Sequence, residues 1–268
     1  MPELPEVETV CRDLSSLAGH EVIEVQIYTP SVIREQAYPG VGLVGRRLRQ
    51  VARRGKFIVL SFSGRHYLLV HMGMSGRLFM RPADDIPTYK HVHLLVRMSG
   101  DIQIIFQDAR RFGGLWFTRL PRSILGKLGV EPLTAEFNAD KLQQLCQDRK
   151  QAIKGILLNQ NLIAGIGNIY ADEALFQAGI RPDKPGGELA YTELSDLTAA
   201  IRQVLTQSIE AHGTTFRDYR DGKRQPGNFQ NFLQVYGRNN QECVKCGNLI
   251  KKVKMSGRGT HFCDHCQK

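Results

Sequence analysis

The first residues of the chain have the types that amine catalysis requires. If Met1 is removed, Pro2 carries a free secondary α-amine, and Glu3 and Glu6 follow closely. An α-amine has a pKa near 8, so about a quarter of it is neutral at physiological pH, against about 0.1% of an ordinary lysine. A neutral secondary amine that attacks a sugar C1′ or a carbonyl carbon forms an iminium ion, which withdraws electrons from neighbouring bonds. The glutamates could move the protons.

The same residues also fit an ordinary helix start. Proline is favoured in the first turn of a helix, and acidic side chains there interact favourably with the helix dipole, whose positive end disfavours a protonated amine. Apolar residues recur every three or four positions from Leu4 to Leu17, which predicts a one-faced helix ending near Gly19. These residues alone leave both interpretations open.

Four cysteines near the C-terminal end have the spacing of a metal site. Cys243 and Cys246 form one Cys-x2-Cys pair, Cys263 and Cys266 form another, and sixteen residues separate them. Four thiolates at this spacing are typical of a closed tetrahedral zinc site. The alternatives are disulfides, which are uncommon in the cytosol, or coincidence. Because four ligands complete the coordination, we predict one structural, non-catalytic Zn²⁺.

The segment between the cysteine pairs is long enough for a β-hairpin, with strands expected near 249–253 and 261–262. Arg258 lies at its tip, between Gly257 and Gly259. A basic tip that zinc holds rigid can enter a groove or bind phosphates. The alternative is a solvated loop arginine. Cys11 and Cys146 lie on apolar faces of predicted helices, where we expect core positions.

The charge of the chain favours a polyanionic partner. The formal net charge is +10, and its distribution is uneven: residues 1–131 carry +6, residues 132–236 carry −1 and residues 237–268 carry +5. Two basic segments around a neutral one fit two arms around a bound nucleic-acid strand. A uniformly basic surface would not give this pattern.

The composition is that of a soluble globular protein, with 42% hydrophobic and 23% charged residues. No apolar run is long enough to span a bilayer, and the acidic N-terminus does not resemble a secretory leader. We therefore expect a cytoplasmic protein with no membrane partner.

Period-two patterns follow the first helix. We expect strands at 22–27, 56–62, 67–72, 77–80, 91–96 and 102–106, punctuated by Gly, Pro, Ser and Asp at short intervals. This spacing is typical of an antiparallel sandwich or barrel, and since no βα unit repeats, a parallel sheet is not expected. Residues 1–131 are predicted to form a helix followed by a β-sandwich.

The pattern becomes helical beyond a Gly/Pro-rich hinge at 125–132. One apolar stripe runs from Leu142 to Leu157 and another from Leu194 to Ile209, closing at Gly213. Strands followed by helices predict an α+β protein with segregated domains. We expect three: 1–131, a β-sandwich domain; 132–236, a helical domain; and 237–268, a zinc finger.

A glycine-rich turn separates two predicted helices at 159–174. Gly165 and Gly167 allow a tight turn, and the N–H groups at the next helix start can hold a phosphate, to which Asn168 adds a side-chain donor. Such turns are also common between packed helices. In the N-terminal domain, Lys56 at a strand start is by itself a solvated strand end, and Met74 and Phe112 are by themselves core or turn residues.

Six separated motifs together resemble the formamidopyrimidine-DNA glycosylase / endonuclease VIII family. They are the N-terminal 2–8, the segment around Lys56, the segments 71–76 and 108–113, the turn 159–174, and Gly-Arg-Gly-Thr before a Cys-x2-Cys pair. They follow the family's order and span essentially the whole chain. One departure is His212-Gly213, where the family often has two glycines.

The resemblance implies a helix–two-turn–helix domain and a four-cysteine zinc-finger hairpin beside the β-sandwich. It implies a bifunctional DNA glycosylase and AP lyase that removes 8-oxoguanine and formamidopyrimidines from double-stranded DNA, acts as a monomer, and breaks the strand by β,δ-elimination. In enzymes that flip a nucleotide, an unbranched Met, a flat Arg and a Phe suit the task of filling the hole.

The resemblance also implies roles for individual residues. Pro2 would be the Schiff-base nucleophile and Glu3 a proton donor, with Glu6 in support. Lys56 would contact the lesion and donate a proton for β-elimination, and Arg258 would contact phosphate and donate a proton for δ-elimination. The implied DNA contacts are His91, Arg110, Asn168, Lys154, Met74 and Phe112.

Two alternatives remain open. The endonuclease VIII branch prefers oxidised pyrimidines and typically begins Met-Pro-Glu-Gly-Pro-Glu, whereas this chain has Leu4. A passive zinc-ribbon DNA-binding protein would give no covalent adduct with DNA on borohydride reduction. The charged, glycine-containing segment 216–229 is expected to be a flexible surface loop, which the resemblance implies is a lid over the flipped base.

Overall fold

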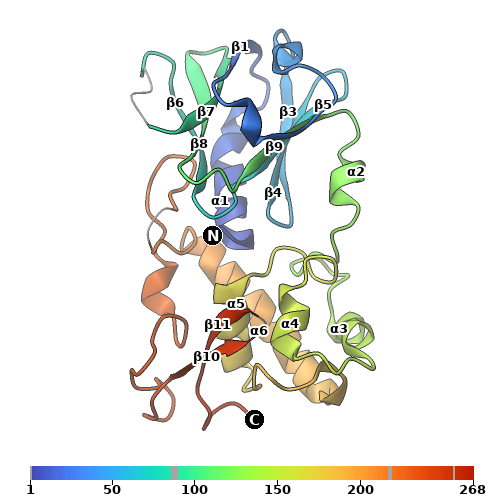
Figure 1. Cartoon of the computed structure of the whole chain (residues 1–268), viewed down its shortest axis with the longest axis vertical. Coiled ribbons are helices and arrows are strands. Elements are labelled where there is room, and N and C mark those ends of the chain that lie inside the picture. The colour runs from blue at the N-terminus through green and yellow to red at the C-terminus, as the bar shows by residue number, and fades with distance from the viewer. Residues whose placement is uncertain (1, 86–89, 217–218, 256) are drawn as a thin grey trace. The chain divides into compact units, whose positions relative to one another are not determined.

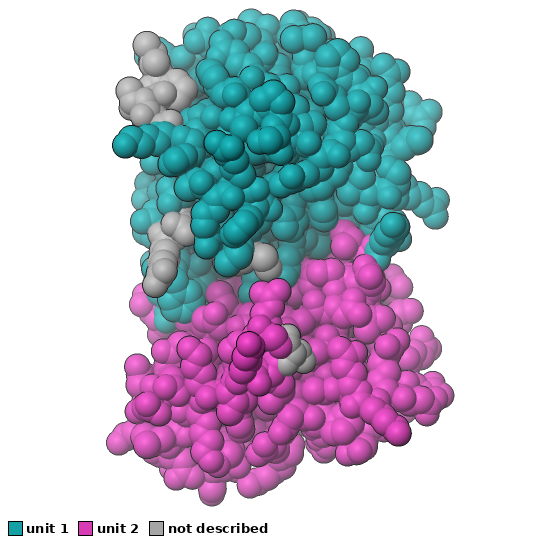
Figure 2. All heavy atoms as spheres, in the orientation of Figure 1, with its two compact units in different colours: residues 1–127, 211–230 teal, residues 128–210, 231–268 magenta. Residues whose placement is uncertain are grey.

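A computed structural model of the chain describes residues 2–85, 90–216, 219–255 and 257–268 (Figure 1). The chain folds into two compact units: residues 1–127 with 211–230, and residues 128–210 with 231–268 (Figure 2). The segment 211–230 belongs to the first unit, although the chain on both sides of it belongs to the second. The predicted three-domain division at 131 and 236 remains a prediction. Residues 1, 217 and 218, on which parts of the predictions fall, lie outside the described residues.

The first unit begins with helix α1 (Leu4–Leu14), which continues as a 3-10 turn (Ser15–Leu17). Its apolar face is fully covered, because Leu4, Val7, Val10 and Leu14 are each 0% exposed. The helix packs against β3, β4 and β6, which belong to two different sheets. The three-and-four spacing therefore produced the expected one-faced helix.

Two sheets make up the rest of the first unit. The four-stranded sheet has the order β1 (Val22–Ile27), β7 (Val92–Met98), β8 (Ile102–Asp108) and β6 (Gly76–Pro82), with antiparallel pairing throughout. The five-stranded sheet has the order β2 (Ile33–Gln36), β9 (Gly114–Thr118), β5 (His66–His71), β4 (Phe57–Phe62) and β3 (Leu48–Arg54). One hydrophobic core contains side chains of α1 and of both sheets, including Cys11.

Shorter elements connect these strands. The 3-10 turns Pro30–Val32 and Gly40–Leu43 lie between β1 and β3, and the short helix α2 (Arg122–Leu125) follows β9. The pair β2–β9 is parallel, which the sequence did not predict. The strand β3 was also not predicted, since three of its seven residues are arginine and hide the period of two.

The described part of the segment 219–229 is tied to the first unit. Gly222 donates its N–H to the Asp13 carboxylate (2.9 Å) and accepts a hydrogen bond from the Met80 N–H (3.0 Å). The Arg224 guanidinium lies over the Phe79 ring at 5.1 Å. Burial, and then the nearby Asp221, raise the pKa of Asp13.

Among its described residues, the second unit contains four α-helices and a two-stranded hairpin. The helices are α3 (Ala139–Cys146), α4 (Ile153–Leu158), α5 (Asn168–Gln177) and α6 (Tyr191–Glu210), and a 3-10 turn covers Gly186–Glu188. The hairpin pairs β10 (Lys251–Met255) with β11 (Arg258–Phe262), and a 3-10 turn (Phe229–Phe232) precedes it in the chain. The apolar stripe expected from 142 to 157 lies on two helices, α3 and α4. Residues 147–152 between them are not helical.

The central helix of this unit is α5, which contacts α4, α6 and β11. All eight residues from Ile169 to Phe176 are buried, including the acidic Asp172 and Glu173. No helix among the described residues is long and apolar enough to cross a membrane.

Candidate functional site

The start of α1 is buried and capped. Pro2 is buried, and Glu3 and Glu6 are 2% and 1% exposed. The Glu3 N–H donates to Glu6 Oε2 (2.8 Å), and the Glu3 side chain accepts from the Glu6 N–H in return. This reciprocal pattern is a capping box, which fixes the chain where the helix begins. The backbone of Glu3, the residue that follows Pro2, is therefore fixed.

Glu6 also holds the segment 211–215. Its second oxygen, Oε1, accepts the Thr214 N–H at 2.8 Å, and Thr214 is 4% exposed. The neighbouring Gly213 has φ +79°, and a Cβ on it would lie 2.9 Å from Glu6 Oε1, so a larger residue would disturb this approach. His212, at the position of the departure from the family's two glycines, also has a positive φ of 60°.

Lys56 lies in the turn between β3 and β4 and is 7% exposed, so it is not a solvated strand end. The nearby His71 accepts the Gly73 N–H at Nδ1 (3.1 Å), which requires an unprotonated Nδ1. Burial, and then the charge of Lys56, lower the pKa of His71 to about 4. The imidazole is consequently neutral near pH 7 and adds no second positive charge beside Lys56.

The loops 72–75 and 109–113, which we call the recognition loops, are fastened to each other by Asp108. Its carboxylate accepts hydrogen bonds from the Ser75 hydroxyl, from the Gly113 N–H (2.7 Å) and from the Arg110 N–H (3.3 Å). The loops also approach closely at Gly73, where an added Cβ would lie 2.5 Å from Gly113 N. We call these three hydrogen bonds the Asp108 clamp. Asp108 is 0% exposed, so the carboxylate that forms the clamp lies inside the protein.

The exposed residues of the recognition loops include the three that the resemblance assigns to DNA, Met74, Arg110 and Phe112. Met74 is 43% and Phe112 57% exposed, and the Arg110 guanidinium lies 5.3 Å from the centre of the Phe112 ring. His91, directly before β7, is exposed with φ +66°, and its carbonyl accepts the Asp108 N–H (3.0 Å). The structure thus brings Met74, Arg110 and Phe112 together and ties His91 to the same aspartate.

The turn between α4 and α5 is organised by a side chain that the sequence analysis missed. Gln160 donates to the carbonyls of Leu158 (3.0 Å) and Ile166 (2.8 Å) and accepts the Gly165 N–H (2.9 Å). Gly165 has φ +94°. This turn ends at Asn168, the first residue of α5, which the sequence placed correctly at a helix start.

The four predicted zinc ligands converge. Their sulfur atoms all lie within 4.8 Å of one another, with Cys243–Cys266 at 3.9 Å and Cys246–Cys263 at 3.5 Å. Thiolates about 2.3 Å from one tetrahedral ion would be about 3.8 Å apart, so the four side chains fit Zn²⁺. The same hairpin presents Arg258, which is exposed at the first position of β11.

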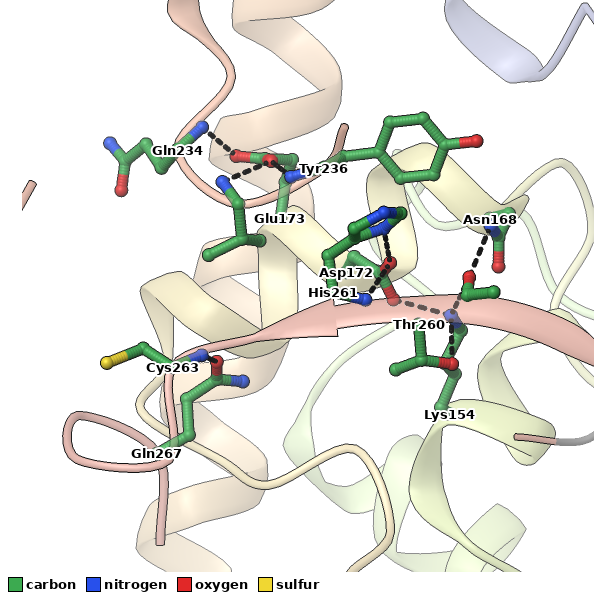
Figure 3. Close-up of polar contacts among 12 residues, drawn as sticks. Lys154, Asn168, Asp172, Glu173, Gln234, Tyr236, Thr260, His261, Cys263 and Gln267 are labelled. Carbon is green, nitrogen blue, oxygen red and sulfur yellow. Dashed lines mark hydrogen bonds and ion pairs between the residues drawn. The ribbon is translucent and has the colours of Figure 1, made fainter. Parts of the chain in front are cut away.

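Lys154 occupies a different kind of environment from the other predicted DNA contacts. It is 0% exposed, and its ammonium lies 2.6 Å from Asp172 Oδ1 (Figure 3). Neither Asp172 nor the supporting residues Asp108 and Thr214 was identified from the sequence as part of a site. The sequence gives little indication of such residues, because a residue that supports a site through hydrogen bonds has no fixed sequence spacing from its partners.

Comparisons with known proteins agree along the whole chain. Residues 1–115 match the formamidopyrimidine-DNA glycosylase N-terminal domain, residues 128–220 its H2TH domain, and residues 240–268 a zinc finger found in FPG and IleRS. A formamidopyrimidine-DNA glycosylase of Syntrophomonas wolfei is 47% identical over 268 residues, with both chains covered completely. The chain belongs to the formamidopyrimidine-DNA glycosylase family. The predicted family and enzyme class, a DNA glycosylase that is also an AP lyase, are confirmed.

Solved structures of this family show the same fold. A mutant FPG of Lactococcus lactis in complex with Fapy-dG-containing DNA has a TM-score of 0.91 at 35% identity, with complete coverage of both chains. The wild-type enzyme of that organism, bound to DNA containing an oxidised pyrimidine, has a TM-score of 0.90 at 34% identity, again over both complete chains. The predicted α+β fold, with its helix, sheets, H2TH domain and zinc finger, is confirmed. The four cysteines are the zinc site of that finger.

Acidification should destabilise the first unit through His71. Unfolded histidine binds a proton near pH 6.5, whereas folded His71 resists protonation down to about pH 4. Its contribution to the free energy of unfolding is therefore present above pH 6.5 and is lost as the pH falls toward 4, at most about 3 kcal/mol. Urea denaturation of a His71→Asn variant should show a shallower loss over this range, while His265→Asn, an exposed control, should match the wild type. An unchanged slope in His71→Asn would contradict this assignment.

An Asp108→Asn change should loosen the recognition loops. One acceptor oxygen becomes an amide donor that faces the Ser75 hydroxyl or the Gly113 N–H, so the free energy of unfolding should fall by about 1–3 kcal/mol. Affinity for lesion-containing duplex should fall with it, as measured by fluorescence anisotropy. Asp101→Asn, at an exposed turn, is the matched control. Wild-type affinity in Asp108→Asn would show that the clamp is not needed.

Removal of zinc should disable the hairpin without unfolding the first unit. A Cys246→Ser variant should lose the metal, about one zinc per chain in the wild type, and should bind duplex DNA more weakly because the hairpin no longer holds Arg258. Cys146→Ala, which removes a buried thiol outside the cluster, should retain the zinc. Metal analysis and DNA titration of the two variants are the measurement, and full zinc content in Cys246→Ser would be the contrary result.

Proposed function

We propose that this glycosylase removes oxidised purines, 8-oxoguanine and formamidopyrimidines, from duplex DNA through a Schiff base on Pro2. The observation that carries the proposal is the buried, capped start of α1, where Glu6 fixes the backbone of Glu3 next to residue 2. A nucleophile at the chain end is effective only if the chain end has one position. The complex of a related FPG with Fapy-dG-containing DNA supports the substrate class.

In the first step the neutral Pro2 nitrogen attacks C1′ of the flipped nucleotide. The bond from C1′ to the base breaks, and the base leaves with the bonding electron pair and takes up the proton that the Pro2 nitrogen loses. Glu3 protonates the ring oxygen of the sugar as the ring opens to an iminium ion. Glu3 suits this role because its backbone is fixed by Glu6 and it is almost fully buried. Glu6, whose two oxygens both accept backbone N–H groups, serves to hold the geometry.

The second stage breaks the DNA strand. The iminium makes the C2′ proton acidic. The carboxylate that Glu3 has become accepts this proton, and the 3′ phosphate leaves by β-elimination. Loss of the 5′ phosphate by δ-elimination follows. We assign the proton donor of the first elimination, and the contact with the lesion, to Lys56, and those of the second elimination and its phosphate to Arg258. The buried position of Lys56 beside a neutral histidine supports its assignment, because the uncharged imidazole does not compete with the ammonium for the substrate's negative charge.

The recognition loops would fill the space that the flipped nucleotide leaves. An exposed Met74 can serve as an apolar wedge, Arg110 can hydrogen-bond the orphaned base, and Phe112 can stack on its neighbour. Because Asp108 binds both recognition loops, the three side chains can enter the DNA as one unit. His91 and Asn168 would contact phosphates. We place this activity in a cytoplasmic, monomeric enzyme acting on chromosomal DNA.

The lesion preference can be tested separately from the nucleophile. Leu4 favours the purine-specific branch, yet a related enzyme has been crystallised with DNA containing an oxidised pyrimidine. A competitive panel of duplexes with oxidised purines and oxidised pyrimidines separates the two branches. Faster excision of the pyrimidines would overturn the purine assignment.

Pro2→Gly should reduce borohydride trapping with 8-oxoguanine duplexes by about 100-fold or more, since the secondary amine that forms the iminium is lost. Trapped adduct is measured by gel shift after reduction. Pro5→Ala alters the same helix start but keeps the secondary amine of Pro2, so it should still trap. Equal trapping by Pro2→Gly and the wild type would refute the assignment of the nucleophile.

A further inference from the structure

A buried ion pair joins two helices of the second unit. Lys154 of α4 and Asp172 of α5 are each 0% exposed, and Nζ lies 2.6 Å from Oδ1 (Figure 3). A lysine is almost never completely buried unless it is paired. The resemblance implied that Lys154 contacts DNA, but an ammonium in this position is covered by the protein itself.

The same ammonium reaches the zinc hairpin. Lys154 Nζ donates to Thr260 Oγ1 (2.8 Å) and to the Gly259 carbonyl (3.3 Å), both in β11. Thr260 is also 0% exposed. Lys154 therefore binds the strand at the two residues that directly follow Arg258.

Asp172 holds the next residue of that strand. Its Oδ2 accepts the His261 N–H at 2.9 Å and lies 3.3 Å from His261 Nδ1. The His261 ring packs against Tyr236 at 5.0 Å between centroids. The two charged side chains together fix three consecutive residues of β11, from Gly259 to His261.

Asn168 meets the strand at the same point. Its side-chain Nδ2 donates to the Gly259 carbonyl at 2.9 Å, so this carbonyl is shared by Asn168 and Lys154. The two residues of this unit that we assign to phosphate, Asn168 and Arg258, are thereby linked through a single residue, Gly259. Figure 3 shows Lys154, Thr260 and Asn168 gathered at this strand.

Burying an ion pair costs folding free energy, because both charges lose their hydration. An apolar pair of similar volume would often stabilise the fold as well as a buried ion pair does, whereas hydrogen-bonded charges fix one register of the elements they join. Here they fix the register of β11 against α4 and α5.

We propose that Lys154 and Asp172 are positioning residues that set Arg258 and Asn168 for phosphate contact, and that Lys154 does not itself touch DNA. The proposal rests on the proposed function only in assigning these two residues to phosphate.

The sharpest test uses the opposite charges of the pair. Lys154→Met and Asp172→Asn should both weaken binding to a duplex with a tetrahydrofuran abasic analogue by about tenfold, the size of one lost charge-assisted contact. In Asp172→Asn the slope of log affinity against log salt should also become less steep by about 0.9, because one phosphate contact is lost. Simple electrostatics predicts the reverse for Asp172→Asn, since removing an acid favours binding to DNA. Unchanged or tighter binding by Asp172→Asn would overturn the proposal.

A second test combines each variant with Arg258→Ala. If the pair acts through Arg258, most of the tenfold effect should disappear in this background, whereas a direct contact of Lys154 with DNA would add to the loss. Full additivity of Lys154→Met and Arg258→Ala would also overturn the proposal.

A double variant separates positioning from stability. Lys154→Met with Asp172→Leu removes both charges of the pair together, so zinc content and melting temperature should approach those of the wild type while binding remains weak. Wild-type binding by this variant would overturn the proposal. Lys184→Met and Glu193→Gln break a pair of 2.7 Å elsewhere in the same unit and should change binding less than about twofold, as expected for partly exposed charges.

Different results would contradict the proposed chemistry and the positioning role of Lys154 and Asp172. If wild-type enzyme gave no borohydride adduct, the proposed chemistry would be wrong, but the affinity measurements would still report on the pair. If the wild type formed the adduct and Asp172→Asn bound DNA normally, only the positioning role would be wrong.

Discussion

The carboxylate of Glu6 is the constraint on which the proposed chemistry depends. It is almost completely buried, and each of its oxygens accepts a backbone N–H, one from Glu3 and one from Thr214. A reactive group at the first residue of a chain is normally the most mobile group in a protein. The capping box removes that freedom at residue 3, and the contact with Thr214 ties the same side chain to a segment more than two hundred residues away.

In the second unit, the small hairpin β10–β11 must also be held in one position. Two strands alone are marginally stable in water. The zinc site fixes the hairpin's base, Gln267 binds both the Cys263 N–H (2.9 Å) and the Ile180 carbonyl (2.8 Å), and Glu173 accepts three N–H groups from 234–236. Burial raises the pKa of Glu173, and those three donors oppose that rise. Polar side chains of α5 therefore hold the segment before the hairpin through Glu173, and the strand β11 itself through Asn168 and Asp172.

Features with a fixed spacing could be predicted from the sequence. The helix α1, six of the strands and the four zinc ligands follow from periods of about 3.6 and 2 and from the ligand geometry of zinc. The strand β3 could not be recognised because its arginines mask the alternation, and the parallel pairing of β2 with β9 depends on tertiary packing.

The supporting residues of the site were harder to predict. Whether Lys154 is buried depends on Asp172, eighteen positions later, and on Thr260, more than a hundred positions later. Asp108 stands inside a recognised motif, yet its three hydrogen bonds to two loops leave no periodic signal. Sequence patterns located the residues that we assign to the substrate, and only the structure identifies what holds them.

The most direct measurement is peptide mapping by mass spectrometry of the enzyme after borohydride reduction with lesion-containing duplex. The account predicts that the sugar remnant is attached to the nitrogen of Pro2, on a chain that has lost Met1. A remnant on a lysine, or active enzyme that retains Met1, would contradict it.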